Sequence, residues 1–161
     1  MATSIAAMFA RHVRAVHADD TVEAMQRVFG FTERPNLPPR YNIAPRQEVP
    51  IVRRTRDGAG RELILIRWGL VPYWPTMSRL ATGRSMPGLE RASARPAFRE
   101  AYRRRRRCLV PADGFFEWRK QGKRRQPLLL RRKDGSPFAF VGLWERWKQL
   151  HGQALLWPEE F

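Results

Sequence analysis

Residues 49–68 read VPIVRRTRDGAGRELILIRW, two apolar runs on either side of Asp57-Gly58-Ala59-Gly60. Apolar runs rich in β-branched residues, separated by a short glycine-containing segment, are typical of β-hairpins. In the second run, Leu63 and Leu65 lie on one face of an extended chain, and Ile64 and Ile66 lie on the other. This strand is therefore predicted to be buried on both faces, and the hairpin indicates a protein built around a sheet.

Helix signals lie on both sides of this hairpin. Asp20-Thr21-Val22-Glu23 matches an N-cap with a carboxylate three residues later, and Gly30 follows the last apolar position of that helix. Between residues 32 and 45 four prolines predict a stiff, extended loop. Pro96 suits the first position of a second helix that leads into Arg103–Arg107.

Strand signals outnumber helix signals. Segment 109–118 is expected to be extended around an Asp113-Gly114 turn, and segments 128–131 and 137–143 are expected to pair through Asp134-Gly135-Ser136. Strands and helices do not alternate as they do in parallel α/β sheets. The sequence thus predicts one α+β domain over residues 1–161, with a mainly antiparallel, curled sheet and flanking helices.

The chain is strongly basic: 31 Lys and Arg face 15 Asp and Glu among 161 residues, a formal net charge of +16. This excess makes a polyanion, and nucleic acid above all, the expected partner. No apolar run approaches the ~20 residues that cross a bilayer, so a membrane-spanning protein is excluded. Cys108 is the single cysteine, which excludes an internal disulfide and a cysteine-based zinc cluster. We expect a reducing compartment, no metal and no cofactor.

Arg103–Arg107 is the densest run of charge. It fits the solvated C-terminal end of a helix, where the helix dipole favours cations. It fits a strip of phosphate contacts equally well. The residues alone leave both interpretations open.

Aromatic residues gather near these basic stretches: Trp68, Tyr73, Trp74, Phe115, Phe116 and Trp118. Core packing is the simpler interpretation for most of them, although aromatic rings interleaved with arginine also bind single strands by stacking. Glu117 lies between two of these rings. It is either a general acid or base in a partly apolar setting or the partner of one of the many arginines.

Several ordered motifs closely resemble the SRAP family, the SOS-response-associated peptidases or abasic-site processing proteins. They are RYNIAP at 40–45, RWGLVP at 67–72, RCLVPADGFFEW at 107–118, QP at 126–127 and FAFVGLWE at 138–145. The resemblance covers about residues 9–147. It implies a barrel-like α+β fold and a protein that acts on DNA.

The resemblance also implies a definite chemistry. Family members bind single-stranded DNA at an abasic site, expose an N-terminal cysteine by removing their own initiator methionine, and trap the sugar aldehyde in a protective thiazolidine crosslink. A glutamate and a histidine move the protons, and the glutamate's motif matches Phe115-Phe116-Glu117-Trp118, so Glu117 is the predicted catalytic residue. The DNA-binding residues implied by the match are Arg40, Asn42, Trp68, Trp74 and Trp118. We expect a monomer in the bacterial cytoplasm, associated with the nucleoid when DNA is damaged.

The N-terminus departs from the family pattern. Aligning Phe9 with the family's N-terminal aromatic residue puts Ala6 where the cysteine belongs, and Ala2 follows the initiator methionine. Without sulfur at that position the thiazolidine ring cannot close. Cys108 falls at a family position inside a strand, so it is expected to be a buried structural thiol.

The middle and the end of the chain depart from it as well. Residues 86–91 keep only Glu90 of a family segment that holds an asparagine and a DNA-contacting arginine, and His151 lies too early to be the catalytic histidine. We therefore expect that crosslinking and self-cleavage are lost. The C-terminal part of the family domain is expected to be missing, which should remove strands and expose sheet edges. Two other functions stay open: a non-catalytic module that binds single-stranded DNA, and a non-functional remnant without a stable fold.

Overall fold

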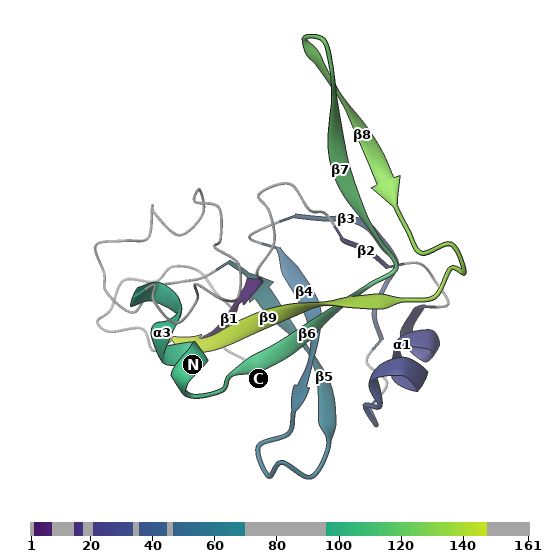
Figure 1. The fold of residues 1–161 in the computed structure, drawn as a ribbon. Helices are drawn as coiled ribbons and strands as arrows, with labels where there is room; N and C mark the ends of the chain where they lie inside the picture. Colours follow the sequence, from purple (N-terminus) through teal and green to yellow (C-terminus); the bar gives the residue numbers. More distant parts are fainter. Residues whose placement is uncertain are drawn as a thin grey trace.

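The computed structural model describes residues 2–7, 15–17, 21–33, 36–44, 47–69 and 96–147. Their elements, in chain order, are β1 (Ala2–Ala7), β2 (Ala15–His17), α1 (Thr21–Phe29), β3 (Arg40–Ile43), β4 (Glu48–Arg54), β5 (Arg61–Trp68), α3 (Pro96–Arg103), β6 (Arg107–Ala112), β7 (Gly114–Gln121), β8 (Arg124–Leu130) and β9 (Phe138–Trp147). Among the described strands one pair, β1 with β5, is parallel and the others are antiparallel. The predicted α+β class with a mainly antiparallel sheet is confirmed (Figure 1).

Five of these strands form a closed barrel in the order β1-β5-β4-β6-β9. The hairpin predicted from residues 49–68 is β4–β5, with Glu48 opposite Arg67 at one end and Arg54 opposite Arg61 at the other. β1 closes the barrel between β5 and β9. In the described part of the chain, exposed sheet edges are therefore confined to a second sheet, at β3 and β8.

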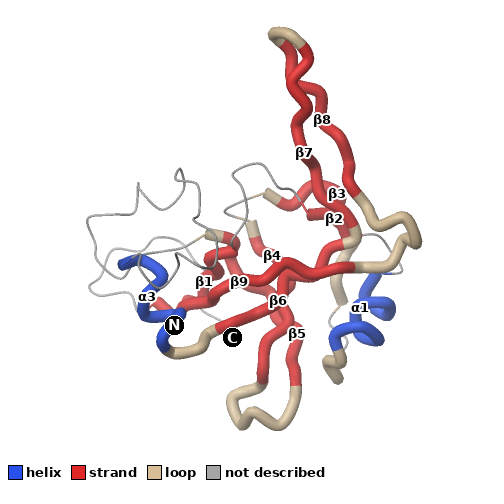
Figure 2. The backbone as a smooth tube through the Cα atoms, in the orientation of Figure 1, coloured by secondary structure: helices blue, strands red, loops and turns tan. Residues whose placement is uncertain are grey.

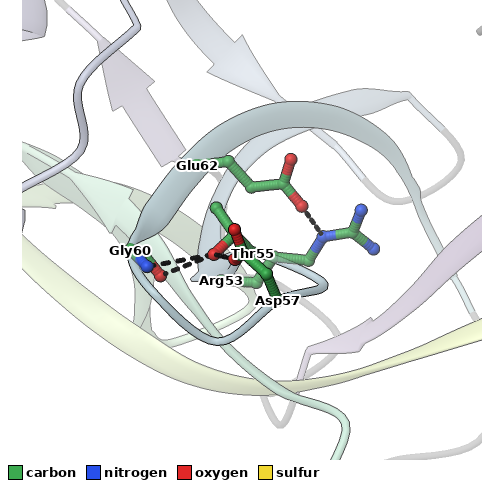
Figure 3. Close-up of polar contacts among 5 residues, drawn as sticks. All are labelled: Arg53, Thr55, Asp57, Gly60 and Glu62. Carbon is green, nitrogen blue, oxygen red and sulfur yellow. Dashed lines mark hydrogen bonds and ion pairs between the residues drawn. The ribbon is translucent and has the colours of Figure 1, made fainter.

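Side-chain hydrogen bonds fix the turn of the β4–β5 hairpin (Figure 3). The Gly60 amide donates to the Thr55 hydroxyl at 3.0 Å, and the Ala59 amide donates to the Asp57 carboxylate at 3.0 Å. The Thr55 hydroxyl also donates to the Asp57 carboxylate at 2.5 Å, and this bond, followed by the one from the Ala59 amide, lowers the pKa of Asp57. This turn could be predicted from local sequence, because the residues that indicate the turn also make its hydrogen bonds.

The barrel wall separates two apolar clusters. Inside the barrel lie Ile43, Val49, Ile51, Ile66, Trp68, Cys108, Val110 and Ala112. Outside it, Met25 and Phe29 of α1 pack with Phe31, Val52 and Leu63. The expectation that the second hairpin strand is buried on both faces is wrong at Leu65, which is 45% exposed. α1 covers the outer face at Leu63 but leaves Leu65 in solvent.

The two helices pack on opposite sides of the barrel (Figure 2). α1 ends as predicted, with the Gly30 amide donating to the Gln26 carbonyl at 2.9 Å. α3 begins at the predicted Pro96 and packs Ala101 against Leu143 of β9. Its end is a Schellman motif, in which the Arg106 amide donates to the Ala101 carbonyl at 2.9 Å. Arg105 therefore occupies the left-handed region with φ 53°, a conformation more common for glycine.

The second sheet has the order β3-β2-β7-β8 and adjoins one end of the barrel. The predicted corner at Asp113-Gly114 is where β6 leaves the barrel and β7 enters this sheet. At Gly114 a Cβ would lie 3.0 Å from the Arg131 side chain and 3.3 Å from the Leu130 carbonyl oxygen. Glycine thus lets β8 approach the corner closely.

The predicted pairing of segments 128–131 and 137–143 is wrong. β8 pairs with β7, and β9 pairs with β1 and β6. The chain reverses earlier, at Gly122, whose φ of +59° suits the first central position of a tight hairpin turn. The Asp134-Gly135-Ser136 turn exists, with the Ser136 amide bonded to the Asp134 carboxylate at 3.0 Å, but it leads the chain from the second sheet back into the barrel.

Candidate nucleic-acid interface

Glu117 lies on β7, two residues after Phe115 and on the same strand face. Phe115 reaches the barrel and contacts Phe138 and Phe140 edge to face, with ring centroids 5.9 and 5.5 Å away. The Glu117 side chain is half-buried. Within the described residues no hydrogen bond or ion pair holds its carboxylate. Of the two sequence interpretations, the arginine partner is therefore absent from this part of the structure.

Trp118 is the next residue on β7, so its side chain leaves the opposite face of the strand. It is half-buried and lies opposite Pro127 of β8. The sequence predicts a catalytic role for Glu117 and a DNA contact for Trp118. The alternation of the strand places their side chains on two opposite faces of one hairpin.

Arg40 and Asn42 lie on β3, in the same sheet as Glu117 with β2 between them. The Arg40 guanidinium donates to the Glu48 carbonyl at 2.6 Å and to the Gln47 side-chain oxygen at 2.9 Å. Its bonds therefore hold the start of β4, and its DNA contact stays a prediction. Asn42 is exposed beside buried Ile43.

Gln47 links this part of the sheet to Trp68, a role that no sequence signal pointed to. Its side-chain oxygen also accepts from the Ala44 amide at 3.1 Å, and its carbonyl accepts from the Trp68 amide at 2.8 Å. The Trp68 side chain is 6% exposed and packs inside the barrel. Little of its ring is available for stacking on a base, so the structure gives it a core position while its DNA contact stays untested. Trp74 lies outside the described residues.

Two residues of the Arg103–Arg107 run form ion pairs within the protein. Arg104 pairs with Glu100 on the exposed side of α3, and Arg106 pairs with Glu145 of β9. Arg106 also lies 5.5 Å from the centroid of the Trp144 ring, where burial lowers its pKa. These pairs favour the helix-end interpretation for Arg104 and Arg106.

The residues that would form a thiol-dependent crosslink do not meet at Glu117. Ala6, aligned with the family's cysteine, lies within β1 opposite Leu143, and its nitrogen is a peptide amide. Ala2 lies opposite Trp147, about 30 Å along β9 from Phe138 at the usual strand rise. Ala2 is thus at the far end of the barrel from β7.

Cys108 is buried inside the barrel as predicted, and burial raises the pKa of its thiol to about 12. The thiolate is the reactive form of cysteine. Cys108 is therefore not a replacement nucleophile. In the described part of the chain no three His, Cys, Asp or Glu side chains gather as metal ligands, and no described helix is long and apolar enough to span a membrane.

Alkylation tests this position of Cys108. At pH 8 the native chain is expected to react about 1,000-fold more slowly than the unfolded chain, whose cysteine pKa is about 8.5. The pKa is raised in the folded state, so the stabilisation from a neutral thiol is complete below about pH 8.5 and is lost as the pH rises toward 12. Mass spectrometry and unfolding at pH 8 and pH 10 measure both effects. Fast labelling of the native chain would contradict the buried position, and Cys108→Ala should remove the cysteine's part of the pH dependence.

Comparison with known proteins shows which family this chain belongs to. The sequence profile of the family described as SOS response associated peptidase (SRAP) matches residues 8–157. The chain belongs to the SRAP family. Its fold is similar to that of a solved crystal structure of a protein from Bordetella bronchiseptica, which has 26% identity and a TM-score of 0.69 over 85% of this chain and 64% of its own.

Relatives of this SRAP chain carry names that refer to DNA damage. Abasic site processing protein YoqW from Bacillus subtilis is 32% identical over 138 residues, which are 85% of this chain and 60% of the relative. Abasic site processing protein HMCES from Xenopus tropicalis is 29% identical over 98 residues, 55% of this chain and 29% of the relative. The SRAP chain thus spans about three-fifths of the Bacillus relative and less than a third of the vertebrate one.

Proposed function

We propose that this chain recognises abasic sites in single-stranded DNA and does so without a thiol-dependent crosslink. The observation that carries the proposal is Glu117: a half-buried carboxylate, in the family's own motif, with no ion pair in the described structure of a chain of net charge +16. A carboxylate that none of the described arginines pairs with is suited to a ligand. The names of the relatives supply the ligand's class.

An abasic site offers chemistry that Glu117 is suited to meet. The ring-opened sugar carries an aldehyde and a hydroxyl. A carboxylate at hydrogen-bond distance accepts a proton from the hydroxyl, and the carboxylic acid formed in that step donates this proton to the aldehyde oxygen. The abasic sugar has no base. A strand can therefore bring this sugar to β7 without first moving a base out of its stack. The family's thiol chemistry is excluded from the proposal because Ala6 lies within a strand and Cys108 lies inside the barrel. We place this activity in the bacterial cytoplasm, in a monomer.

The direct test incubates the purified chain with a single-stranded oligonucleotide that carries one abasic site, and with its undamaged counterpart. Binding is measured by fluorescence anisotropy, and covalent products are measured on denaturing gels with and without borohydride. We expect tighter binding of the abasic oligonucleotide and no heat-stable adduct in the absence of borohydride. A heat-stable adduct would overturn the exclusion of crosslinking, and equal binding of the two oligonucleotides would overturn recognition of the lesion.

A non-catalytic binding module is the second candidate, favoured by the positions of Ala6 within β1 and of Cys108 inside the barrel. The Glu117→Gln variant separates the two candidates because it keeps the size and polarity of the side chain but removes its proton chemistry. If the chain processes the lesion, strand scission or borohydride-trapped product should fall by roughly 100-fold or more while binding of undamaged DNA is unchanged. A variant that keeps its product yield would leave binding as the function.

A further inference from the structure

The hairpin arm, residues 119–126 of β7, its turn and β8, extends away from the barrel (Figure 1). All of its residues are exposed, in contrast to the half-buried Glu117 and Trp118 at its base. No second layer covers either of its faces within the described structure (Figure 2). The shape of the arm therefore has no explanation in the packing of the core.

The arm carries an unbalanced charge. Its cations are Arg119, Lys120, Lys123, Arg124 and Arg125, and the sequence has no acidic residue between Glu117 and Asp134. Among the described residues none of these cations has a carboxylate partner. Lys120 lies directly opposite Arg125, a like-charge pair that destabilises a hairpin. The arm as a whole is therefore a cationic surface suited to an anionic ligand.

The register of β7 and β8 divides the cations between two faces. Directly opposite residues share a face, and successive residues of a strand alternate. Arg119 pairs with Gln126, and Gln121 pairs with Arg124, so Arg119 and Arg124 lie on the Glu117 face. The opposite face carries Lys120 and Arg125, in line with Trp118. Each face thus holds one pair of cations in the arm, beside a different predicted site residue.

We propose that Arg119 and Arg124 bind the phosphate backbone of the DNA strand whose abasic site lies at Glu117. The proposal rests on the proposed function, because it takes Glu117 as the point where the lesion lies. Arg119 lies about 7 Å and Arg124 about 13 Å along the hairpin from Glu117 at the usual strand rise. The phosphates of the neighbouring nucleotides of a strand lie at comparable distances from the abasic sugar. Arginine is suited to these contacts because its guanidinium makes paired hydrogen bonds with phosphate oxygens.

Single-stranded DNA is the occupant that the observations favour. Arg119 and Arg124 follow one another along the hairpin from Glu117, as the phosphates of a strand follow one another from a lesion, and the half-buried Glu117 at the base of the arm suits an isolated sugar. The Gln121 and Gln126 side chains on the same face are neutral hydrogen-bonding groups for the backbone between the two arginines. An acidic protein surface would not need this linear arrangement.

Two matched double variants test the assignment, Arg119→Gln with Arg124→Gln and Lys120→Gln with Arg125→Gln. Both remove two charges from the same arm and differ in the face they alter. Affinity for undamaged and abasic single strands is measured at several salt concentrations, and thermal unfolding checks that each variant is folded. The Arg119/Arg124 variant should lower the slope of log affinity against log salt by about 1.4, or ~0.7 for each lost phosphate contact. With this change in slope, the ratio of parent to variant affinity should be roughly 25-fold larger at 0.1 M salt than at 1 M salt.

The Lys120/Arg125 variant is expected to change affinity less than about threefold, since its charges act only at a distance. Equal losses in the two variants would overturn the proposal, because the arm would then act by net charge alone. A larger loss in the Lys120/Arg125 variant would also overturn it and would place the DNA on the Trp118 face. No loss in either would show that the arm does not touch DNA.

The same measurements separate this proposal from the proposed function. A phosphate contact weakens binding of every sequence alike, so the Arg119/Arg124 variant should keep the parent chain's ratio of abasic to undamaged affinity. If the parent chain showed no preference for abasic DNA, recognition of the lesion would fail while the Arg119/Arg124 contact could still be measured on undamaged strands. If the parent chain preferred abasic DNA and the variant bound as tightly as the parent, only the arm assignment would fail.

Discussion

The Phe31→Ala variant is expected to lose about 4 kcal/mol of unfolding free energy, because a buried phenylalanine leaves both its transfer energy and a cavity behind. Phe31 is 2% exposed and belongs to the cluster that joins α1 to the outer wall of the barrel. Chemical or thermal unfolding followed by circular dichroism measures the loss. A cooperative transition of the parent chain in this experiment would also exclude the interpretation of an unfolded remnant.

Val28→Ala is the matched control for this prediction. Val28 lies on α1, close to Phe31 in the chain, but it is 55% exposed, so its truncation should change the unfolding free energy by no more than about 0.5 kcal/mol. If Phe31→Ala were as mild as Val28→Ala, α1 would not be anchored to the barrel as described.

Glu62→Leu is expected to destabilise the chain by about 3 kcal/mol, since it leaves a cation without its partner in a poorly hydrated place. The Arg53 Nε atom lies 2.7 Å from the Glu62 carboxylate, and the Arg53 side chain is 11% exposed (Figure 3). The Arg53 guanidinium also lies 4.4 Å from the centroid of the Trp144 ring. The ring attracts the cation but does not accept the hydrogen bonds that the carboxylate accepts.

Two further variants decide whether the charge is the cause. Adding Arg53→Met to Glu62→Leu should restore most of the lost stability, because an apolar pair replaces the ion pair. Glu100→Leu removes the exposed partner of Arg104 and should cost no more than about 0.5 kcal/mol beyond its helix propensity. If the double variant stayed as unstable as Glu62→Leu, the volume of the leucine would be responsible.

The parts of the fold that could be predicted are those whose signals are local. Residues 49–68 contain both strands of a hairpin and the hydrogen-bonding residues of its turn, and Gly30 ends α1. The partners of β8 and β9 could not be predicted, because pairing of β9 with β1 joins residues more than a hundred positions apart. The turn at Gly122 lacks the Asn-Gly or Asp-Gly dipeptide that is typical of tight hairpins. The cations around it are typical of a solvated surface and do not indicate a turn.

The candidate site likewise contains some features that could be predicted from the sequence and others that could not. Glu117 could be singled out because a carboxylate between aromatic residues is unusual in a basic segment. That its neighbour Trp118 faces the other way follows from strand geometry, once the segment is known to be a strand. The position of Trp68 depends on which face of β5 the barrel encloses, and the role of Gln47 depends on three partners that no spacing in the sequence reveals.

The strand that closes the barrel sets the order in which this chain can fold. β1 precedes every other described element in the chain, yet one of its partners, β9, is the last of them. During synthesis β5 is available to β1 early, but the edge of β1 that pairs with β9 stays unsatisfied until β9 has left the ribosome. Pairings over such long sequence separations are slow, because the chain loses the entropy of the whole intervening loop before any contact repays it. Slow closure leaves strand edges open to other chains, so the yield of native protein should depend on keeping nascent chains apart.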